Sequence, residues 1–262
     1  MTAPRTPSEI FERAVEEGDR RLDQSFLELA STSFIAGFTI VFGIVALGLV
    51  ESFVEPTLGH VANVAGALAF GLGVVFLVAG RTELFNENFS DPTAAAVERS
   101  DVSPLPALGR LWVVTLVFNL VGGGLFSLVF AAEGAVPPES ATVLETTAEA
   151  VAHRSPLSWF TRGIAGGALV SLLSFLLVSV RGDGSRLGLA YAVGVLLALG
   201  PFDHVVVSVL HVFLGALLGA TVTRTTLVTL TAVVTAGNLV GGLGLVTFTH
   251  VTQAMGSDGP DE

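Results

Sequence analysis

The chain has 262 residues, of which 51% are hydrophobic and only 13% are charged. Soluble domains carry about 25% charged residues, so this composition indicates an integral membrane protein with little mass outside the bilayer. A formal net charge of −11 without any lysine leaves no basic patch for nucleic acid, and the absence of cysteine excludes disulfides and thiolate metal sites.

Residues 1–30 are predicted to form a cytoplasmic, amphipathic N-terminal helix. The run Thr6-Pro7-Ser8-Glu9 is typical of a helix start, with a threonine cap, a proline in the first turn and a glutamate three residues after the cap. Apolar side chains then recur at helical spacing, at Phe11, Val15, Leu22, Phe26 and Leu29. Such a helix lies on the membrane surface, lies against a neighbouring subunit, or simply leads into the first membrane span.

Residues 31–250 form the predicted membrane domain, because the remaining apolar runs are long enough for six helices across a bilayer. They lie near 31–51, 60–80 (with a broken continuation to about 97), 107–131, 159–180, 187–222 (broken at 200–204) and 226–250. Arginine is more frequent in the loops on one side, which predicts cytoplasmic termini and a multi-pass protein of the plasma membrane. The acidic loop 132–157 then faces outward, and residues 251–262 are expected to be a disordered acidic tail.

Two of these hydrophobic segments are interrupted by polar residues. The fifth span is broken at Gly200-Pro201-Phe202-Asp203-His204, and the second runs into a charged stretch over residues 81–92. Charges and helix breakers at membrane depth are tolerated only where they line a cavity or pack against protein. Broken helices at corresponding places in two halves indicate a transport pathway near the bilayer midplane.

The two halves of the chain repeat. The sequence Asn119-Leu-Val-Gly-Gly in the third span returns as Asn238-Leu-Val-Gly-Gly in the sixth, and the same offset carries Phe85 in the first break to His204 in the second. Each half has three spans, so the second half enters the membrane upside down relative to the first. The predicted fold is an all-α polytopic membrane protein, an inverted 3+3 repeat with helices 2 and 5 broken.

The best candidate for a functional residue is His204, because it follows a helix break and its charge can change near physiological pH. A cationic imidazole would attract an anion and could give it a proton, so that a neutral acid crosses the apolar part. Ser208 and His211 extend a polar stripe on the same helix face. For His211, packing and an outer-side proton site are equally good interpretations. Phe202 and Phe85, at the two breaks, are candidates for apolar constrictions.

The other polar residues of the breaks have supporting roles in this interpretation. Arg81 is expected to pair with Glu83, Glu87 or Asp203, and the amides of Asn119 and Asn238 to bond free backbone groups at the breaks. The outer-loop residues Glu145, Glu149 and His153 have a spacing like that of metal ligands, but a solvated acidic face is the better interpretation. We therefore predict no metal, no cofactor and no enzymatic activity.

These motifs resemble those of the formate/nitrite transporter family over roughly residues 25–250. The run Gly80–Asn88 looks like the family's break motif in the second span, Phe202-Asp203-His204 resembles its Phe-Glu-His motif in the fifth, and the Asn-Leu-Val-Gly-Gly copies match the third and sixth. The resemblance implies an aquaporin-like protomer, a homopentamer with one pore in each protomer, and passage of small monovalent anions such as formate or nitrite.

The chain also departs from the family pattern. Asn86 stands where the family has a pore-loop threonine that partners the histidine, and Glu87 replaces a small residue. The resulting hypothesis is a channel or proton-coupled carrier for small weak-acid anions, with His204, Phe202, Phe85, Asn86 and Ser208 along the pore. Two alternatives stay open, a pore for neutral solutes such as water or glycerol, and a membrane protein that keeps the fold without transporting.

Overall fold

The computed structural model describes residues 5–99 and 105–257, and helices make up almost all of them. The elements are α1 (Pro7–Leu22), α2 (Phe26–Leu58), α3 (Val61–Ala79), η1 (Phe85–Asn88), α4 (Ser90–Glu98), α5 (Leu105–Phe130), α6 (Pro138–Ala152), α7 (Pro156–Ser179), α8 (Asp183–Leu199), α9 (Val205–Leu218), α10 (Arg224–Leu239), η2 (Val240–Thr247) and α11 (Phe248–Ser257). The all-α membrane fold predicted from the sequence is confirmed.

The membrane-crossing helices follow the apolar runs. Within the described ranges, five stretches are long and apolar enough to span a bilayer, namely Phe26–Leu58, Val61–Ala79, Leu105–Phe130, Pro156–Ser179 and Arg224–Gln253. The fifth predicted span is divided between α8 and α9, and residues 200–204 between them carry no helix. The second ends at Ala79 and continues, after a non-helical stretch, as the short helices η1 and α4.

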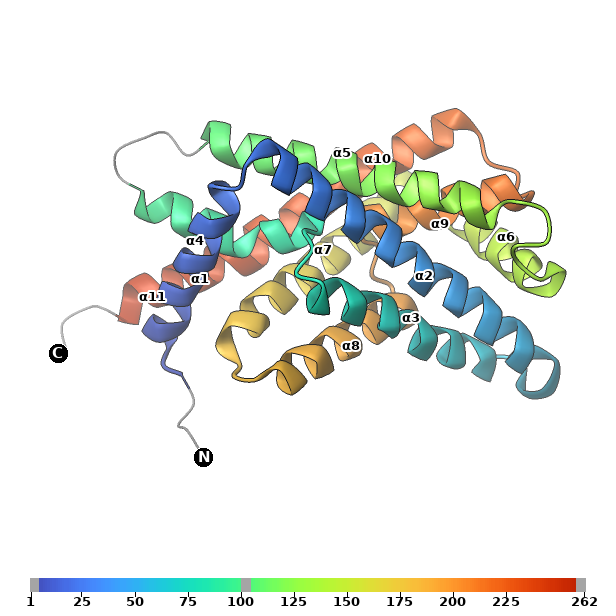
Figure 1. The fold of residues 1–262 in the computed structure, drawn as a ribbon, viewed down its shortest axis with the longest axis horizontal. Coiled ribbons are helices and arrows are strands. Elements are labelled where there is room, and N and C mark those ends of the chain that lie inside the picture. Colours follow the sequence, from blue (N-terminus) through green and yellow to red (C-terminus); the bar gives the residue numbers. More distant parts are fainter. Residues whose placement is uncertain (1–4, 100–104, 258–262) are drawn as a thin grey trace.

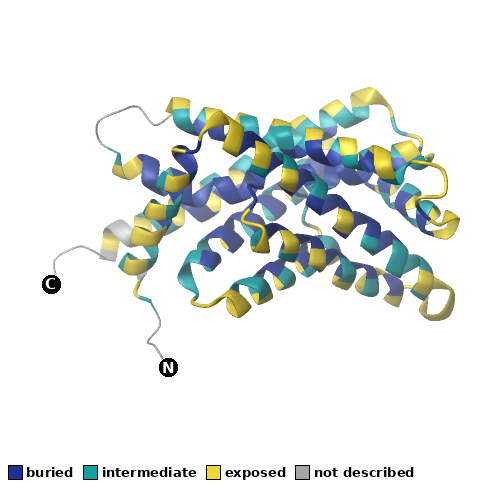
Figure 2. Ribbon diagram, viewed as in Figure 1, coloured by how far each residue is buried: buried dark blue, intermediate teal, exposed yellow. Residues whose placement is uncertain are grey.

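The bundle packs the two halves of the chain against each other (Figure 1). Helix α2 packs on α3 and α5 in the first half, α7 packs on α10 and η2 in the second, and α3 contacts α8 across the halves. Both described ends of the chain lie at the end of the bundle that holds α1, α4 and α11, and α6 lies at the other (Figure 1). Exposed residues cover the outside, whereas every residue from 82 to 92 is buried (Figure 2).

The inverted repeat is visible in how closely the helices approach. A Cβ atom at Gly37 would collide with the backbone of Asn119, and one at Gly122 with the backbone of Phe34. In the second half, Gly167 stands in the same relation to Asn238, and Gly241 to the backbone of Ile164. The glycines beside each asparagine motif therefore let the first and third helices of each half touch backbone to backbone.

Three segments differ from their predicted form. The acidic loop 132–157 contains the helix α6, which packs on α9 because Ser140, Leu144 and Ala148 form a buried stripe at four-residue spacing. Helix α11 continues to Ser257, seven residues into the predicted disordered tail, whose last residues, 258–262, lie outside the described part. The N-terminal helix α1 lies against α4 and α11 of its own chain.

The close contact of α1 with α4 is possible because Gly18 has no side chain. A Cβ atom there would collide with the backbone oxygen of Asp91 and the side chain of Ala95.

The sixth span also contains a feature that its sequence pattern does not show, because its helix widens to a π-helix over Val240–Thr247. The π-helix includes Gly242, where a Cβ would meet the Phe89 ring.

Candidate functional site

One asparagine holds each break. The side-chain oxygen of Asn119 accepts the backbone N–H of Phe85 at 3.0 Å, and its amide donates to the carbonyls of Ser33 and Glu83 at 2.7 and 2.9 Å. These bonds satisfy backbone groups that a continuous helix would pair internally. Both the break and the asparagine are buried, so water does not compete for these groups.

The second half repeats this arrangement. The oxygen of Asn238 accepts the N–H of Val205 at 2.9 Å, and its amide donates to the carbonyls of Gly163 and Asp203 at 2.7 and 2.8 Å. The backbone N–H that Asn119 accepts lies 34 residues earlier in the chain, whereas the N–H that Asn238 accepts lies 33 residues earlier. The structural partner of Phe85 is therefore Val205, and the predicted pairing of Phe85 with His204 is wrong by one residue.

We expect Asn238→Leu to lower the thermal unfolding midpoint of the detergent-purified protein sharply. The substitution leaves the Val205 N–H and the carbonyls of Gly163 and Asp203 without partners, and each such buried group costs about 1–3 kcal/mol. Asn119→Leu should behave alike, because it removes the same three kinds of bond. Asn63→Leu, on an exposed position of α3, is the matched control and should leave the midpoint unchanged. An unchanged midpoint in Asn238→Leu would contradict the bracing role.

His204 ends the second break and caps α9. It is 0% exposed, and its Nδ1 accepts the backbone N–H of Val207 at 3.4 Å. In the neutral ring the proton then resides on Nε2. Among the described residues, Nε2 has no hydrogen-bond partner. The break thus presents a buried N–H donor that no described side chain or backbone group satisfies.

The other predicted pore residues lie at the two breaks or on α9. Phe85 is 2% exposed, and its ring packs edge-on against that of Phe89, with 4.9 Å between the ring centroids. Phe202, at the other break, packs on the same hydrophobic core. Asn86 is fully buried, and neither the oxygen nor the nitrogen of its side-chain amide bonds to any side chain or backbone group in the described ranges. Ser208 and His211 are buried on α9.

The acid beside His204 is held by two arginines. Arg154 donates to both carboxylate oxygens of Asp203, at 3.0 and 3.1 Å, and Arg162 donates to one of them at 3.3 Å. Arg154 lies in the turn after α6, and Arg162 lies in α7. The predicted pairing of Arg81 with Glu83, Glu87 or Asp203 is wrong, since within the described ranges Arg81 forms no ion pair with them. Arg81 is exposed, with a positive φ of 50°.

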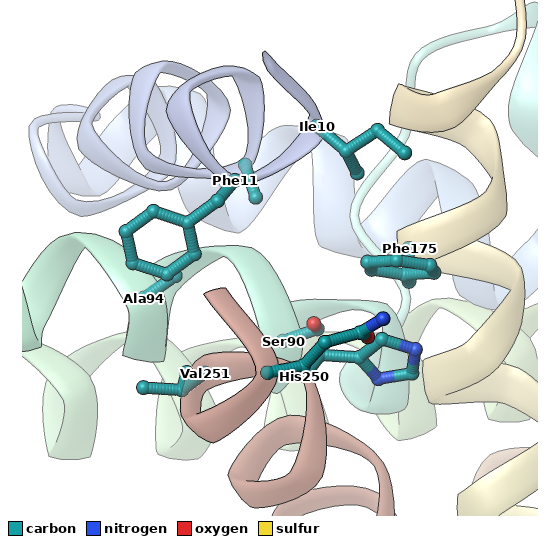
Figure 3. Close-up of a pocket in the computed structure, with 9 residues that line it drawn as sticks. Ile10, Phe11, Ser90, Ala94, Phe175, His250 and Val251 are labelled. Atoms are coloured by element: carbon teal, nitrogen blue, oxygen red, sulfur yellow. The ribbon is translucent and has the colours of Figure 1, made fainter. Parts of the chain in front are cut away.

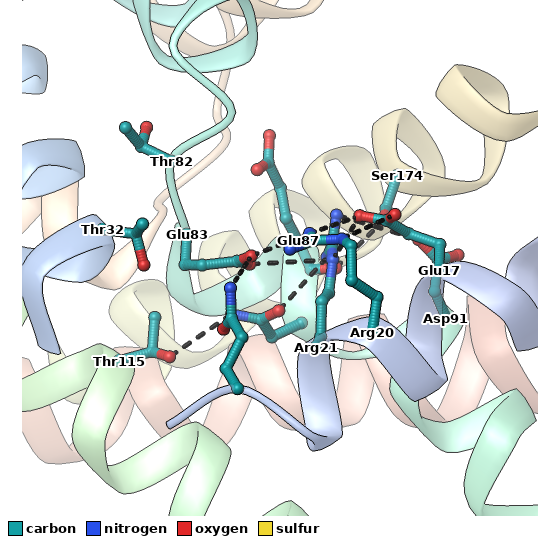
Figure 4. A network of polar contacts seen from close by, with 12 residues as sticks. Glu17, Arg20, Arg21, Thr32, Thr82, Glu83, Glu87, Asp91, Thr115 and Ser174 are labelled. Carbon is teal, nitrogen blue, oxygen red and sulfur yellow. Dashed lines mark hydrogen bonds and ion pairs between the residues drawn. The ribbon is translucent and has the colours of Figure 1, made fainter. Parts of the chain in front are cut away.

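The corresponding acid of the first break is held by α1. Glu83, whose carbonyl binds Asn119 as that of Asp203 binds Asn238, contacts Arg20 at 3.0 Å and Arg21 at 3.6 Å (Figure 4). Arg21 also reaches the backbone carbonyl of Glu87 and lies 3.9 Å from Asp91. Each half of the molecule therefore places a carboxylate at its break and neutralises it with two arginines.

The contact with the first break shifts the pKa values of charged groups on α1. Burial alone would raise the pKa of Glu17, but hydrogen bonds and charges from Arg20 and Arg21 lower it to about 2. Burial alone would lower the pKa of Arg21, but the carboxylates of Glu83, Asp91 and Glu17 raise it. Both groups therefore stay ionised at neutral pH, and α1 binds the break as an ion-paired helix.

A cavity of 210 Å³ lies within this network, where α1 faces Asp91 and α7, and two more lie close by. One, of 280 Å³, lies between α1, the first break and the start of α8, and we call it the α1-side cavity; its lining includes Arg81, Glu83, Glu87 and Arg186. The other, of 240 Å³, lies between α1, α4, α7 and α11 (Figure 3). Its walls are largely apolar, and the ring of His250 lies 3.7 Å from that of Phe175. This last cavity belongs to the packing of α1 and α11 on the bundle.

Sequence reasoning missed the arginines that hold the two acids. Arg20, Arg21, Arg154 and Arg162 counted in the sequence only as markers of loop orientation. For Arg20 and Arg21 a signal exists, because these two adjacent arginines lie in the predicted amphipathic helix ahead of the first span. For Arg154 and Arg162 the contact depends on how α6 and α7 bring distant residues to the second break, which no local pattern indicates.

The sequence model of the formate/nitrite transporter family matches residues 8–252. Among curated relatives, an uncharacterised transporter of Bacillus subtilis, YwcJ, is 27% identical over 84% of this chain and 86% of its own length. The inner membrane protein YfdC of Escherichia coli is 22% identical over 76% of this chain, and the match spans 63% of the YfdC length.

Solved structures share the fold. An ion channel of the same family superimposes with a TM-score of 0.82 at 17% identity, over 93% of this chain and 98% of the other. A pentameric formate channel with formate bound superimposes with a TM-score of 0.72 at 19% identity, over 88% and 98%. The match of the family model over nearly the whole chain, together with this fold, shows that the protein is a multi-pass member of the formate/nitrite transporter family.

Proposed function

We propose that the protein conducts small monovalent weak-acid anions, such as formate, through a pore in each protomer, with His204 at its centre. The observation that carries this proposal is the unsatisfied Nε2 donor of His204, at 0% exposure and in the break of a membrane-spanning segment. A buried donor of this kind can replace part of the hydration that an anion loses in an apolar passage.

The surroundings of His204 favour an anion. The one carboxylate next to it in sequence, Asp203, is already neutralised by Arg154 and Arg162. The rings of Phe85 and Phe202 border the same apolar core as α9, which suits constrictions that exclude water. We further propose that the imidazole exchanges a proton with the anion, so that the neutral acid crosses the most apolar part.

The assembly that we propose is a homopentamer with both termini in the cytoplasm. Support comes from the likeness to a pentameric formate channel and from large apolar side chains exposed on the outside of α2 and α5, including Phe42, Phe53, Val117 and Leu125. Such side chains are stable only against lipid or neighbouring protomers. Both described ends lie at the same end of the bundle, as an even number of spans requires (Figure 1).

A substrate panel on reconstituted protein tests the proposal. We expect proteoliposomes to take up labelled formate well above the rate of protein-free vesicles, at pH 6 and at pH 8, and to show no swelling with glycerol. Glycerol permeation without formate uptake would instead favour a neutral-solute pore. No flux of either solute through an intact oligomer would favour a membrane protein that keeps the fold without transporting. An ion-paired plug from Arg81 to Asp203, which would suit that last alternative, is not among the described ion pairs.

A further inference from the structure

Glu87 is a buried carboxylate that the proposed mechanism does not use. It is 3% exposed, and its Oε1 finds no hydrogen-bond partner in the part of the chain that the structure describes. Its carboxylate also forms no ion pair with a described arginine, although Arg21 binds its backbone carbonyl. In Figure 4 the carboxylate points away from the interactions that join the neighbouring side chains.

The neighbouring acids are not isolated in this way. Glu83 contacts Arg20, Arg21 and Gln24. Asp91 accepts the hydroxyl of Ser174 at 2.9 Å and lies 3.9 Å from Arg21. The guanidinium of Arg21 is thus shared among several other acceptors. An ionised carboxylate without a partner is costly to bury, and a carboxylic acid avoids most of that cost by holding its proton.

Protons can reach Glu87 from water. It lines the α1-side cavity, whose rim carries the exposed residues Arg81 and Asp183. The site therefore combines a buried side chain with an aqueous approach. It lies two residues after Phe85, at the entrance to the first break from the side of α1.

The charges that face Glu87 come from several elements. Helix α1 supplies two arginines and one glutamate, and the first break and α4 supply one carboxylate each. The rim of the cavity adds two arginines and one aspartate. The residues of α7 next to Glu87, Ser174 and Leu177, carry no charge. These charged groups are Glu17, Arg20, Arg21, Glu83, Asp91, Arg81, Asp183 and Arg186. Inside the rim, two arginines already face three carboxylates, so an ionised Glu87 would add a fourth negative charge.

We propose that Glu87 binds a proton at neutral pH and that this proton keeps the α1-side entrance open to anions. Loss of the proton adds a further negative charge at the entrance, which repels an arriving anion and lowers its local concentration. This role depends on the glutamate at position 87, because the small residue of the family pattern would place no titratable group in the cavity. This inference rests on the proposed anion transport.

The test is the pH dependence of formate flux in proteoliposomes, with equal pH on both sides. Wild-type flux should fall at alkaline pH, by up to about tenfold for each pH unit once Glu87 ionises. Glu87→Gln, which resembles the protonated form, should keep its flux at neutral pH and show a clearly smaller alkaline fall, since the proton exchange proposed for His204 is unchanged in this variant. Glu87→Asp should retain a fall, because it still titrates. Glu12→Gln, on an exposed position of α1, is the matched control and should behave as wild type.

A second measurement does not depend on transport. Infrared difference spectra between neutral and alkaline pH should show a protonated carboxyl band in wild type that Glu87→Gln lacks and Glu12→Gln keeps. The same alkaline fall in Glu87→Gln as in wild type, or a neutral-pH spectrum in which that variant keeps the band, would overturn the proposal. Failure of wild-type protein to carry formate at any pH would overturn the transport function instead, and the spectra would still decide whether Glu87 holds a proton.

Discussion

We expect His204→Ala and His204→Asn to lower formate flux into proteoliposomes by about a hundredfold. Loss of one preorganised donor to a negative charge in a water-excluded site costs on this order. Alanine removes the Nε2 donor altogether. Asparagine supplies an amide donor but cannot change its charge, so its loss of flux would show that the proton of the imidazole is needed as well as its hydrogen bond.

The control for this experiment is His60→Asn. His60 lies at the exposed turn between α2 and α3, far along the chain from either break. Its flux should equal that of wild type, and all variants should elute at the same oligomeric size. Wild-type flux in His204→Ala would remove the histidine from the mechanism. Flux retained only in His204→Asn would keep the hydrogen bond and remove the proton transfer.

The architecture could be predicted because its determinants are local in sequence. Apolar runs define the spans, and Gly200-Pro201 ends α8 at the predicted break, since neither residue continues a helix well. The repeated asparagine motif identified the two halves, because in each half an asparagine side chain binds the free backbone groups of the break. The alignment of Phe85 with His204 failed by one residue, because the first half holds one more residue between its break and its asparagine.

The partners of the charged groups could not be predicted in this way. The sequence shows that Glu83, Glu87 and Asp91 lie within nine positions of each other, but not that α1 folds back over them. That contact depends on Gly18, whose lack of a side chain lets α1 approach α4, and glycines are frequent throughout this chain. The same limit applies to α6, whose buried stripe of Ser140, Leu144 and Ala148 was hidden among acidic residues.

Replacing Arg21 by methionine is expected to destabilise the α1-side of the protein strongly. Methionine keeps most of the apolar stem but removes the charge that lies among Glu17, Glu83 and Asp91. Breaking a buried ion pair by removing one partner costs about 3–5 kcal/mol, because it leaves the other charge uncompensated. The side chain of Arg21 is only 10% exposed and that of Glu83 only 2%, so water cannot replace the lost partner.

The measurement is the thermal unfolding midpoint together with proteolysis of α1. In Arg21→Met the midpoint should fall, and protease should cut within α1 under conditions in which wild type is protected, because the helix loses its anchor on the break. Arg13→Met, an exposed position on the same helix, should change neither readout. If the variant unfolds and is cleaved like wild type at neutral pH, then α1 is held by its apolar contacts on α4 and α11, and the ion pairs contribute little.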